Sequence, residues 1–327
     1  MATIYDVARR AGVSTYTVSA VLNRSAYVSP PLTQRVLAAV RALDYTINDL
    51  ARSLQRRETR IIGMLIPDIV NPFYAKVVRG VEDVLKKAGY SLLLGNTYDD
   101  PGEQARYVAV FRSKQVDGLI VFVAPGEGAE VRRLVEAHKP VVFVSRKPMG
   151  FEADTVAPDS VKGTRLAVQH LIRKGHRRIG IIVGPASLTV NAERILGWRR
   201  ALRAAGLPAD ERLIGDGDGT PPSALRLTLA LLDLDSPPTA IFASSFPVMT
   251  GVLTALKERG LTCPAEVEVM SSDEHEWLDL FEPRISTVVQ PNYTMGAEAA
   301  QLLLKRVRHP KRRCQSIVLA PELRIRD

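Results

Sequence analysis

The chain has 327 residues, 46% of them hydrophobic, and a mean hydropathy of +0.00. This length predicts two or three domains, and this composition predicts a globular protein with a sizeable core. No apolar run reaches the ~18 residues of a membrane span, and the first residues lack the features of a signal peptide. We therefore expect a cytoplasmic protein that does not enter a membrane.

The net charge of +9 is unevenly spread along the chain. Residues 1–60 contain nine arginines and four acidic residues, so they hold +5 of that charge in less than a fifth of the length. A basic segment attached to a nearly balanced body indicates a head that binds a polyanion. A basic solubilising face is the alternative that the charge alone leaves open.

Residues 3–23, TIYDVARRAGVSTYTVSAVLN, predict two short helices joined by a tight turn. Ile4, Val7 and Ala8 recur at helical spacing, and Ser14 can cap a second helix by accepting a backbone N–H of its first turn. This pattern is typical of a helix-turn-helix, whose second helix enters the DNA major groove. The structural alternative is an ordinary helical hairpin in a core.

A third helix is expected to begin at Pro30, since proline is tolerated in a first helical turn. Its apolar side chains extend to Leu43 and complete a small three-helix core. Asn48 is a plausible cap for a short helix over 49–56, which is too short to be stable in water alone. We therefore expect that this segment forms only when something else holds it in place.

From residue 61 onward, short apolar runs alternate with amphipathic stretches, which indicates βαβ units and parallel sheets. The glycine-rich residues 215–219 predict a flexible connection, because they lack the lysine and flanking strand of a phosphate loop. The strand at 286–289 and the helix at 293–307 are expected to lead the chain back to its first α/β part. The other expected strands are 61–66, 90–94, 118–123, 141–144, 179–183, 240–243, 267–271 and 316–323, and the other expected helices are 73–88, 103–114, 131–138, 162–174, 192–205, 223–232 and 248–259.

The residues of common catalytic and metal sites are not arranged in their usual motifs. The five histidines form no HxxxH motif, and neither Cys263 nor Cys314 has metal-type spacing to a histidine. A nucleophile elbow and a Walker loop are also absent from the sequence. We therefore predict no catalytic site, no metal and no cofactor, and we interpret the cysteines as reduced thiols.

The N-terminal motifs resemble the lactose-repressor (LacI/GalR) family of transcriptional regulators. The matching residues are Thr3–Ala8, Ala11–Ser14, Thr17–Ser19, Leu22-Asn23, Val28-Ser29, Tyr45, Asn48 and Ala51–Leu54. The resemblance covers essentially the whole chain. It implies a multi-domain protein with an all-α helix-turn-helix head and a two-lobed α/β core of the periplasmic-binding-protein type with parallel sheets.

The same resemblance implies domain boundaries. The DNA-binding head would comprise 1–47, the hinge helix and linker 48–60, and the effector-binding and dimerisation core 61–327. Within the core, the N-lobe would take about 61–158 and 290–320, and the C-lobe about 159–289 and the C-terminal end.

The function implied is that of a sequence-specific repressor whose operator affinity is controlled by a sugar or sugar acid bound between the lobes. The family works as homodimers on double-stranded, pseudo-palindromic operators, because two heads are needed for specificity. The alternatives are a sugar-binding transport-type protein or an enzyme on the same two-lobed core. The first would need a signal peptide and no DNA-binding head, and the second would need acid, base and nucleophile sets.

In the head, Thr15, Tyr16 and Ala20 match the family's base-reading positions, where alanine offers only an apolar contact such as one to a thymine methyl group. In the hinge, Leu54 matches a leucine that wedges between base steps in the minor groove. Ile47 replaces the family's usual proline at the start of this hinge. The other expected DNA contacts, mostly to phosphates, are Thr3, Tyr5, Ser14, Thr17, Ser19, Asn23, Ser29, Thr33, Asn48, Ala51 and Arg52.

Four core residues match the family's effector-binding positions or lie next to them. Phe73, after the first strand, matches a residue that packs on the ligand, although it could simply be a core residue of its helix. The guanidinium of Arg194 can bind two ligand oxygens at once, and the carboxylate of Asp273 can accept two hydroxyl protons. Arg146 is the fourth candidate.

Departures from the family pattern affect the expected ligand. Ser145 stands before Arg146 where the family often has aspartate, Ser244-Ser245 lack an acid, and no aromatic residue follows Asp218. We therefore expect a pocket that has lost carboxylates and one stacking ring. Because two arginines are available, the sequence allows either an anionic sugar acid or a neutral sugar as the ligand.

Overall fold

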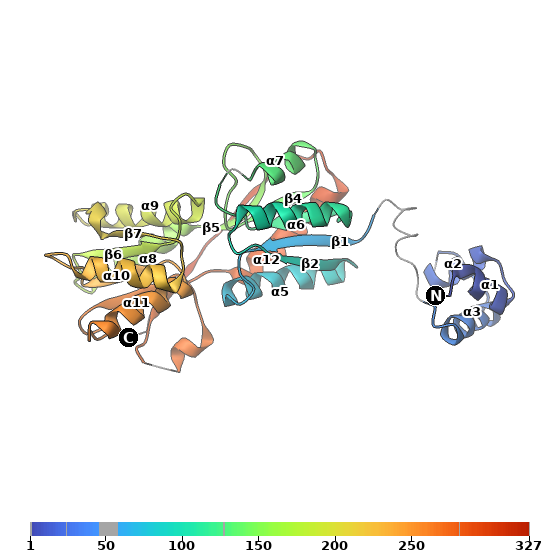
Figure 1. Ribbon diagram of the computed structural model, residues 1–327, viewed down its shortest axis with the longest axis horizontal. Helices are drawn as coiled ribbons and strands as arrows, with labels where there is room; N and C mark the ends of the chain where they lie inside the picture. The colour runs from blue at the N-terminus through green and yellow to red at the C-terminus, as the bar shows by residue number, and fades with distance from the viewer. Residues whose placement is uncertain (1, 24, 46–57, 127, 281, 327) are drawn as a thin grey trace. The chain divides into compact units, whose positions relative to one another are not determined.

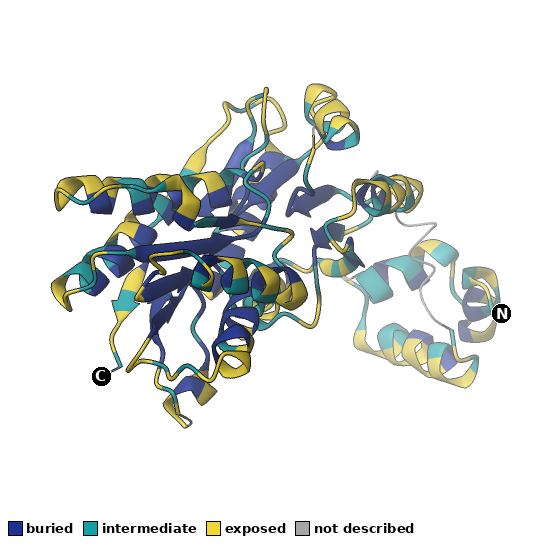
Figure 2. Ribbon diagram, turned by 60° about the vertical axis from the view of Figure 1, so that its left-hand side comes forward, coloured by how far each residue is buried: buried dark blue, intermediate teal, exposed yellow. Residues whose placement is uncertain are grey.

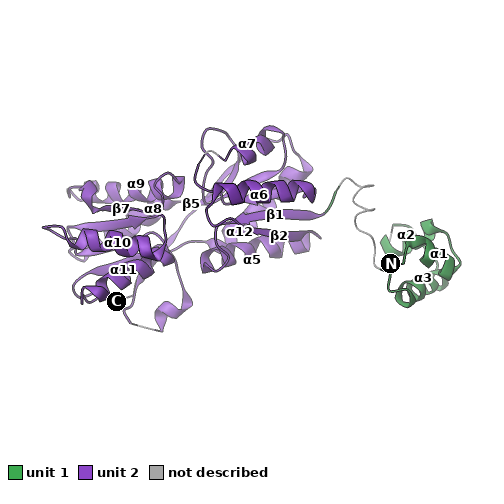
Figure 3. Cartoon of the chain, in the orientation of Figure 1, with its two compact units in different colours: residues 1–59 green, residues 60–327 purple. Residues whose placement is uncertain are grey.

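The structure is a computed structural model, and it describes residues 2–23, 25–45, 58–126, 128–280 and 282–326. The chain divides into two compact units, residues 1–59 and residues 60–327 (Figure 3). Each unit has its own hydrophobic core. The expected hinge contacts Asn48, Ala51, Arg52 and Leu54, together with Ile47, lie outside the described residues.

The first unit contains the three predicted helices, α1 (Ile4–Ala11), α2 (Thr15–Asn23) and α3 (Pro30–Ala42). A capping box between Thr3 and Asp6 satisfies N–H groups at the start of α1. Gly12, at φ 62°, ends α1 in the left-handed conformation that a side chain would strain. The small core that these helices enclose consists of Val7, Ala8, Ala11, Val18, Val36 and Ala39.

The second unit contains two six-stranded sheets covered by helices (Figure 1). The first sheet has the order β11-β5-β4-β3-β1-β2, with strands β1 (Ile61–Ile66), β2 (Ser91–Asn96), β3 (Gly118–Val121), β4 (Val141–Val144), β5 (Asp154–Pro158) and β11 (Ser316–Leu319). The second has the order β12-β10-β9-β8-β6-β7, with strands β6 (Ile179–Val183), β7 (Ile214–Asp216), β8 (Ala240–Ala243), β9 (Glu268–Ser271), β10 (Ser286–Val289) and β12 (Glu322–Arg324). Every pairing is parallel except that of β12 with β10.

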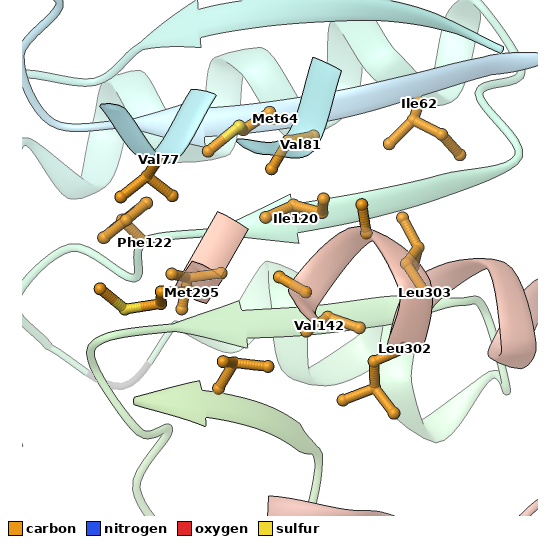
Figure 4. Close-up of a cluster of buried hydrophobic side chains, with 14 of the residues drawn as sticks. Ile62, Met64, Val77, Val81, Ile120, Phe122, Val142, Met295, Leu302 and Leu303 are labelled. Carbon is orange, nitrogen blue, oxygen red and sulfur yellow. The ribbon is translucent and has the colours of Figure 1, made fainter. Parts of the chain in front are cut away.

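The helices cover both faces of each sheet, which is why the inner strands are buried along nearly their whole length (Figure 2). Helices α5 and α12 close one face of the first sheet over a core that includes Ile62, Ile120 and Leu303 (Figure 4), and α6 and α7 close the other. In the second lobe α8 and α9 cover one face, and α10 and α11 cover the other. The eight core helices are α5 (Pro72–Lys87), α6 (Pro101–Ser113), α7 (Ala129–Glu136), α8 (Ser160–Arg173), α9 (Thr189–Ala204), α10 (Pro221–Leu232), α11 (Phe246–Glu258) and α12 (Asn292–Arg308).

Helices α5 and α12 pack unusually closely because each has a glycine at the crossing point. A Cβ on Gly80 would collide with the carbonyl oxygen of Tyr293, and one on Gly296 would collide with that of Val77. Side chains at either position would therefore push the helices apart. This close pair fixes α12 against the first sheet, although the strand that precedes it belongs to the second.

The structure corrects four details of the predicted elements. Strand β5 was not predicted, because Asp-Thr-Val-Ala-Pro is not an apolar run, and β7 lies where we expected a flexible connection. The predicted strand at 316–323 is two strands in different sheets, since Pro321 interrupts it. Strand β10 stays in the second sheet, so only α12 returns to the first lobe. The chain thus crosses between the lobes three times, after β5, after β10 and after β11.

Candidate functional site

The turn of the head is built as the sequence predicts. The Oγ of Ser14 accepts a hydrogen bond from the Thr17 backbone N–H at 3.1 Å, and its contact with the Thr17 hydroxyl is 3.0 Å. These bonds confirm Ser14 as the cap of α2. The side chain of Tyr16, in the first turn of this helix, is 74% exposed. The N-terminal end of α2 therefore offers hydrogen-bonding groups to solvent.

The predicted DNA contacts differ in accessibility. Tyr5 is 69% exposed, whereas Ala20 is only 2% exposed, so its methyl group is not offered to a base. We therefore leave Ala20 out of the base-reading set. Thr3 and Ser14 are exposed, and the partly exposed members are Thr15, Thr17, Ser19, Asn23, Ser29 and Thr33.

Sequence reasoning missed a structural role for Arg35 on α3. Its guanidinium donates to the carbonyl of Ala11 at 2.6 Å and to that of Gly12 at 3.4 Å. These carbonyls lie at the end of α1, where backbone acceptors have no helical partner. Arg35 thus ties the third helix to the turn that orients α2, and only its place in the folded head reveals this role.

The four predicted effector residues line one cavity of about 700 Å³ between the two lobes. Phe73 and Arg146 come from the first lobe, and Arg194 and Asp273 come from the second. Each follows the carboxyl end of a strand or lies in the first turns of a helix, which is where open α/β sheets bind ligands. The fold therefore brings together residues that are up to 200 positions apart in the sequence.

Arg146 is held by partners from two other loops, which follow β2 and β3. Its guanidinium forms a two-pronged ion pair with Asp99, with one bond of 2.9 Å, and donates to the carbonyl of Val123 at 3.0 Å. Burial would lower the pKa of Arg146, but the neighbouring Tyr74 and Asp99 raise it above the usual value. Burial also raises the pKa of Tyr74 to about 12, so this phenol stays protonated. Arg146 is therefore a fixed cation in the cavity wall.

Arg194 and Asp273 form the facing wall. Arg194 donates to Asn191 Oδ1 at 2.9 Å and lies 3.4 Å from Ser272 Oγ. Asp273 accepts from the Phe246 backbone N–H at 2.8 Å and from Gln290 at 3.2 Å. Burial lowers the pKa of Arg194 and raises that of Asp273, so in both groups it disfavours the charged form. Ligand hydroxyls that bind these groups would restore part of the lost solvation.

Phe73 both packs in the core and lines the cavity. Its ring makes edge-to-face contacts with Tyr74 at 5.0 Å and with Phe122 at 6.1 Å between centroids. The two interpretations of Phe73 are therefore compatible. The aromatic cluster gives this end of the cavity a rigid apolar surface.

The pocket nevertheless contains carboxylates and aromatic rings at other positions than those of the family pattern. Asp99 and Asp218 both line the cavity, and so do the aromatic residues Tyr98 and Phe246. Asp99 follows β2 rather than β4, so a motif-by-motif comparison does not find it. A single signal was available in the sequence, because Asp99 also follows the carboxyl end of a predicted strand.

One residue next to Arg146 links the two lobes directly. The backbone N–H of Lys147 donates to Thr189 Oγ1 at 2.9 Å, and its ammonium group forms an ion pair with Glu193 at 2.7 Å. Glu193 precedes Arg194 on α9, so the bridge joins the neighbours of both cavity arginines. We call Lys147, Thr189 and Glu193 the lobe bridge.

The described part of the chain contains no group of three His, Cys, Asp or Glu side chains that could hold a metal ion. Among the described helices, none is both long enough and apolar enough to cross a bilayer.

A helix-turn-helix head joined to a two-lobed core with a polar cavity between the lobes defines the class of ligand-responsive DNA-binding regulators. Residues 3–48 match the family model of bacterial regulatory proteins of the lacI family, and residues 168–327 match that of periplasmic binding protein-like domains. The HTH-type transcriptional repressor PurR of Vibrio atlanticus (strain LGP32) is 34% identical over 325 residues, which cover 99% of this chain and 97% of that repressor. The chain therefore belongs to the LacI family of transcriptional regulators.

Solved structures agree with this assignment. The transcriptional regulator CelR in complex with cellobiose has a TM-score of 0.76 and 32% identity, and the match covers 99% of both chains. The lac repressor dimer bound to operator and the anti-inducer ONPF has a TM-score of 0.87, with 99% of this chain and 98% of that one covered. Its 24% identity supports the fold alone.

Proposed function

We propose that this regulator represses transcription as a homodimer on a pseudo-palindromic operator, and that a neutral sugar in the interlobe cavity controls its operator affinity. The observation that carries the proposal is the convergence of Arg146, Arg194, Asp273 and Phe73 on one cavity in a chain with a DNA-binding head. Action on chromosomal operators would place the protein in the cytoplasm.

The proposed DNA contacts begin at the exposed end of α2. Thr15 and Tyr16 are assigned to base edges, and the hydroxyl and amide groups of the remaining head residues to phosphates. One head makes few contacts, so specificity requires two heads on two half-sites. The hinge positions around Leu54 complete the proposed DNA surface.

The charges of the cavity favour a neutral ligand over a sugar acid. Its described lining contains four aspartates, at 68, 99, 218 and 273, against two arginines, which gives a formal charge of −2. The first turns of α5, α9, α10 and α11 also face the cavity, and each helix N-terminus contributes roughly half a positive charge. These contributions approximately cancel, so an anion would gain no net attraction. The cellobiose complex of CelR is consistent with a sugar ligand.

Switching would follow from a shift between lobe arrangements. A ligand that binds one arrangement more tightly stabilises it, and this changes the separation of the two heads in a dimer. By linkage, the operator and the ligand must change each other's affinity by the same factor. Whether the sugar releases or promotes DNA binding depends on which arrangement it prefers.

The test combines operator selection with a ligand screen. Full-length protein should enrich a pseudo-palindrome from random double-stranded DNA, and Tyr16→Ala should reduce that binding in mobility-shift assays. A thermal-shift screen should find a neutral sugar that stabilises the protein, since a ligand at 100 times its dissociation constant adds about 2.7 kcal/mol. Stabilisation by sugar acids but by no neutral sugar would overturn the charge argument. Binding to DNA that survives removal of residues 1–57 would overturn the assignment of the head.

A further inference from the structure

The cavity is larger than one sugar ring requires. A water molecule takes roughly 30 Å³ of liquid volume, so a cavity of about 700 Å³ has room for on the order of twenty waters. A hexose has about a dozen non-hydrogen atoms, and covalent bonding makes each of them occupy less space than a water. One ring therefore fills about half of the cavity at most. The remaining volume has room for a second ring of the ligand in place of water.

The mouth of the cavity is more exposed and more apolar than its interior. Tyr98 and Val70 both line the cavity, but they are 73% and 80% exposed, whereas Arg146 and Asp273 deeper inside are 8% and 5% exposed. Tyr98 and Val70 lie on neighbouring loops, which are joined by the bond from the Tyr98 N–H to the Pro67 carbonyl at 2.8 Å. The cavity thus combines a charged interior with an apolar rim.

Tyr98 is held in a conformation that a non-glycine residue adopts only at a cost. Both Tyr98 and Asp99 have left-handed backbones, with φ of 53° and 58°. The preceding Thr97 is anchored to the carbonyl of Ile66, and the following Asp100 caps α6. The strained pair sets Asp99 against Arg146 and leaves the ring of Tyr98 at the rim. Strain that the surrounding structure maintains is characteristic of ligand sites.

An aromatic ring at the mouth of a polar cavity is suited to a flat group with C–H bonds on its face. The electron-rich face of the ring attracts the positively polarised edges of such a group. A second pyranose ring presents C–H groups on one side, and a planar aryl group presents its edge or face. Both would leave the first ring in the interior with Arg146, Arg194 and Asp273.

We propose that Tyr98 forms an outer subsite, and that the ligand is a glycoside whose second ring stacks on Tyr98 while its first sugar ring occupies the charged interior. This inference rests on the proposed sugar-sensing function and specifies the size and shape of the ligand. Tyr98 is a specificity-determining residue in this arrangement, and Asp99 beside it is a positioning residue for Arg146.

The experiment measures binding to the full-length protein by titration calorimetry after a thermal-shift screen. The probes are single-ring sugars (glucose, galactose), their two-ring counterparts (cellobiose, maltose, lactose) and 4-nitrophenyl glycosides. We expect a two-ring ligand to bind at least about 10-fold more tightly than its single-ring component. The aryl glycosides distinguish a preference for a second sugar from a preference for any flat ring.

Three variants separate the subsite from folding effects. Tyr98→Asn removes the ring but keeps a residue that tolerates the left-handed backbone, so it should abolish the two-ring advantage and leave single-ring affinity unchanged. Tyr98→Phe should retain the advantage. Tyr293→Asn removes a half-exposed tyrosine outside the lining of this cavity and should have no effect.

The outcomes distinguish this proposal from the function on which it rests. If single-ring sugars bind as tightly as two-ring ligands, and Tyr98→Asn changes neither, the outer subsite is wrong and sugar sensing stands. If no sugar binds at all, both proposals fail. A two-ring advantage that survives Tyr98→Asn would place the second ring elsewhere and would also overturn the inference.

Discussion

The polar groups of the DNA-binding head and those of the ligand cavity differ in their exposure and in their separation along the sequence. In the head, the candidate contacts come from one short stretch of sequence, and side chains such as Tyr5 and Tyr16 stay exposed. In the cavity, Arg146 and Asp273 are buried and come from segments that are distant in the sequence. Asp99 neutralises Arg146, and backbone and amide groups already bind Asp273.

This difference reflects the partners that the two regions accommodate. DNA brings its own high charge density, so exposed groups on a small rigid head are sufficient, and binding depends on salt. The small neutral ligand that we propose for the cavity would have to be recognised by groups that are desolvated and oriented before it arrives. Variants in one region should therefore leave the other region's binding intact in isolated assays, and a coupled effect should appear only when both ligands are present.

The largest effect is expected for Arg194→Gln in the cavity. This change removes a guanidinium that can bind two ligand oxygens, and each hydrogen bond to a charged group contributes roughly 1.5–3 kcal/mol. Sugar affinity should fall by about 100-fold or more, while operator affinity without sugar stays unchanged. Calorimetry and mobility shifts measure the two effects.

The matched control is Arg199→Gln on the same helix. Arg199 pairs with Glu211 at the surface and does not line the cavity. Equal losses from Arg194→Gln and Arg199→Gln would mean that the helix, rather than the cavity group, is responsible.

The next effect is expected in the head, for Tyr16→Ala. Loss of one base-reading side chain should weaken operator binding by about 10- to 100-fold and should reduce discrimination at one base-pair position. Tyr27→Ala is the comparison, because Tyr27 is 89% exposed in the loop after α2 and has no proposed base contact. A uniform loss on all sequences would instead make Tyr16 a phosphate contact.

The head and the core differ in how far their structures could be predicted from the sequence. The head was predictable because its signals are local: the cap Ser14, the helical spacing from Ile4 to Ala8, and the turn before α2 all lie within one segment. The alternating pattern of the core also follows from local periodicity. Strands β5 and β7 were missed because their residues carry no apolar run, and only pairing with β4 and β6 makes them strands.

The cavity was partly predictable for a related reason. Arg194 and Asp273 follow recognisable motifs, but the partner of Arg146 lies 47 positions away, and no local pattern joins it to Asp99. The roles of Tyr98 and Arg35 likewise depend on contacts between segments. The motif also does not show which residues are buried. Ala20 occupies a base-reading position in the motif but is covered in the fold.

A smaller effect tests whether the cavity depends on the link between its lobes. Lys147→Glu or Glu193→Lys should each lower sugar affinity by about 3- to 5-fold, because like charges would oppose the lobe bridge. The effect is modest since both side chains are partly exposed. The double variant, which reverses the ion pair, should recover most of the affinity. Failure of this recovery in a double-mutant cycle would show that the pair does not couple the lobes.

The smallest effect concerns the protonation of His275, whose ring packs at a tilt against that of the cavity residue Phe246, with 4.5 Å between the ring centroids. Its buried Nε2 has no hydrogen-bond partner in the described structure. Burial lowers the pKa of His275 below its usual 6.5, although Asp273 opposes this. The folded protein therefore keeps the ring neutral where the unfolded chain binds a proton. The resulting stability is full above pH 6.5 and declines as the pH falls below it.

The loss at pH 6.0 should be at most about 0.8 kcal/mol, because it is limited by protonation of the unfolded chain. Thermal unfolding of the full-length protein between pH 7.5 and 6.0 should show a shallower decline in His275→Gln than in the unmodified chain. His309→Gln, at an exposed position, should leave the decline unchanged. An identical decline in all three proteins would mean that His275 takes up its proton equally well in the folded state. That result would contradict the view that buried groups beside the cavity, unlike the exposed groups of the head, have their protonation set by the fold.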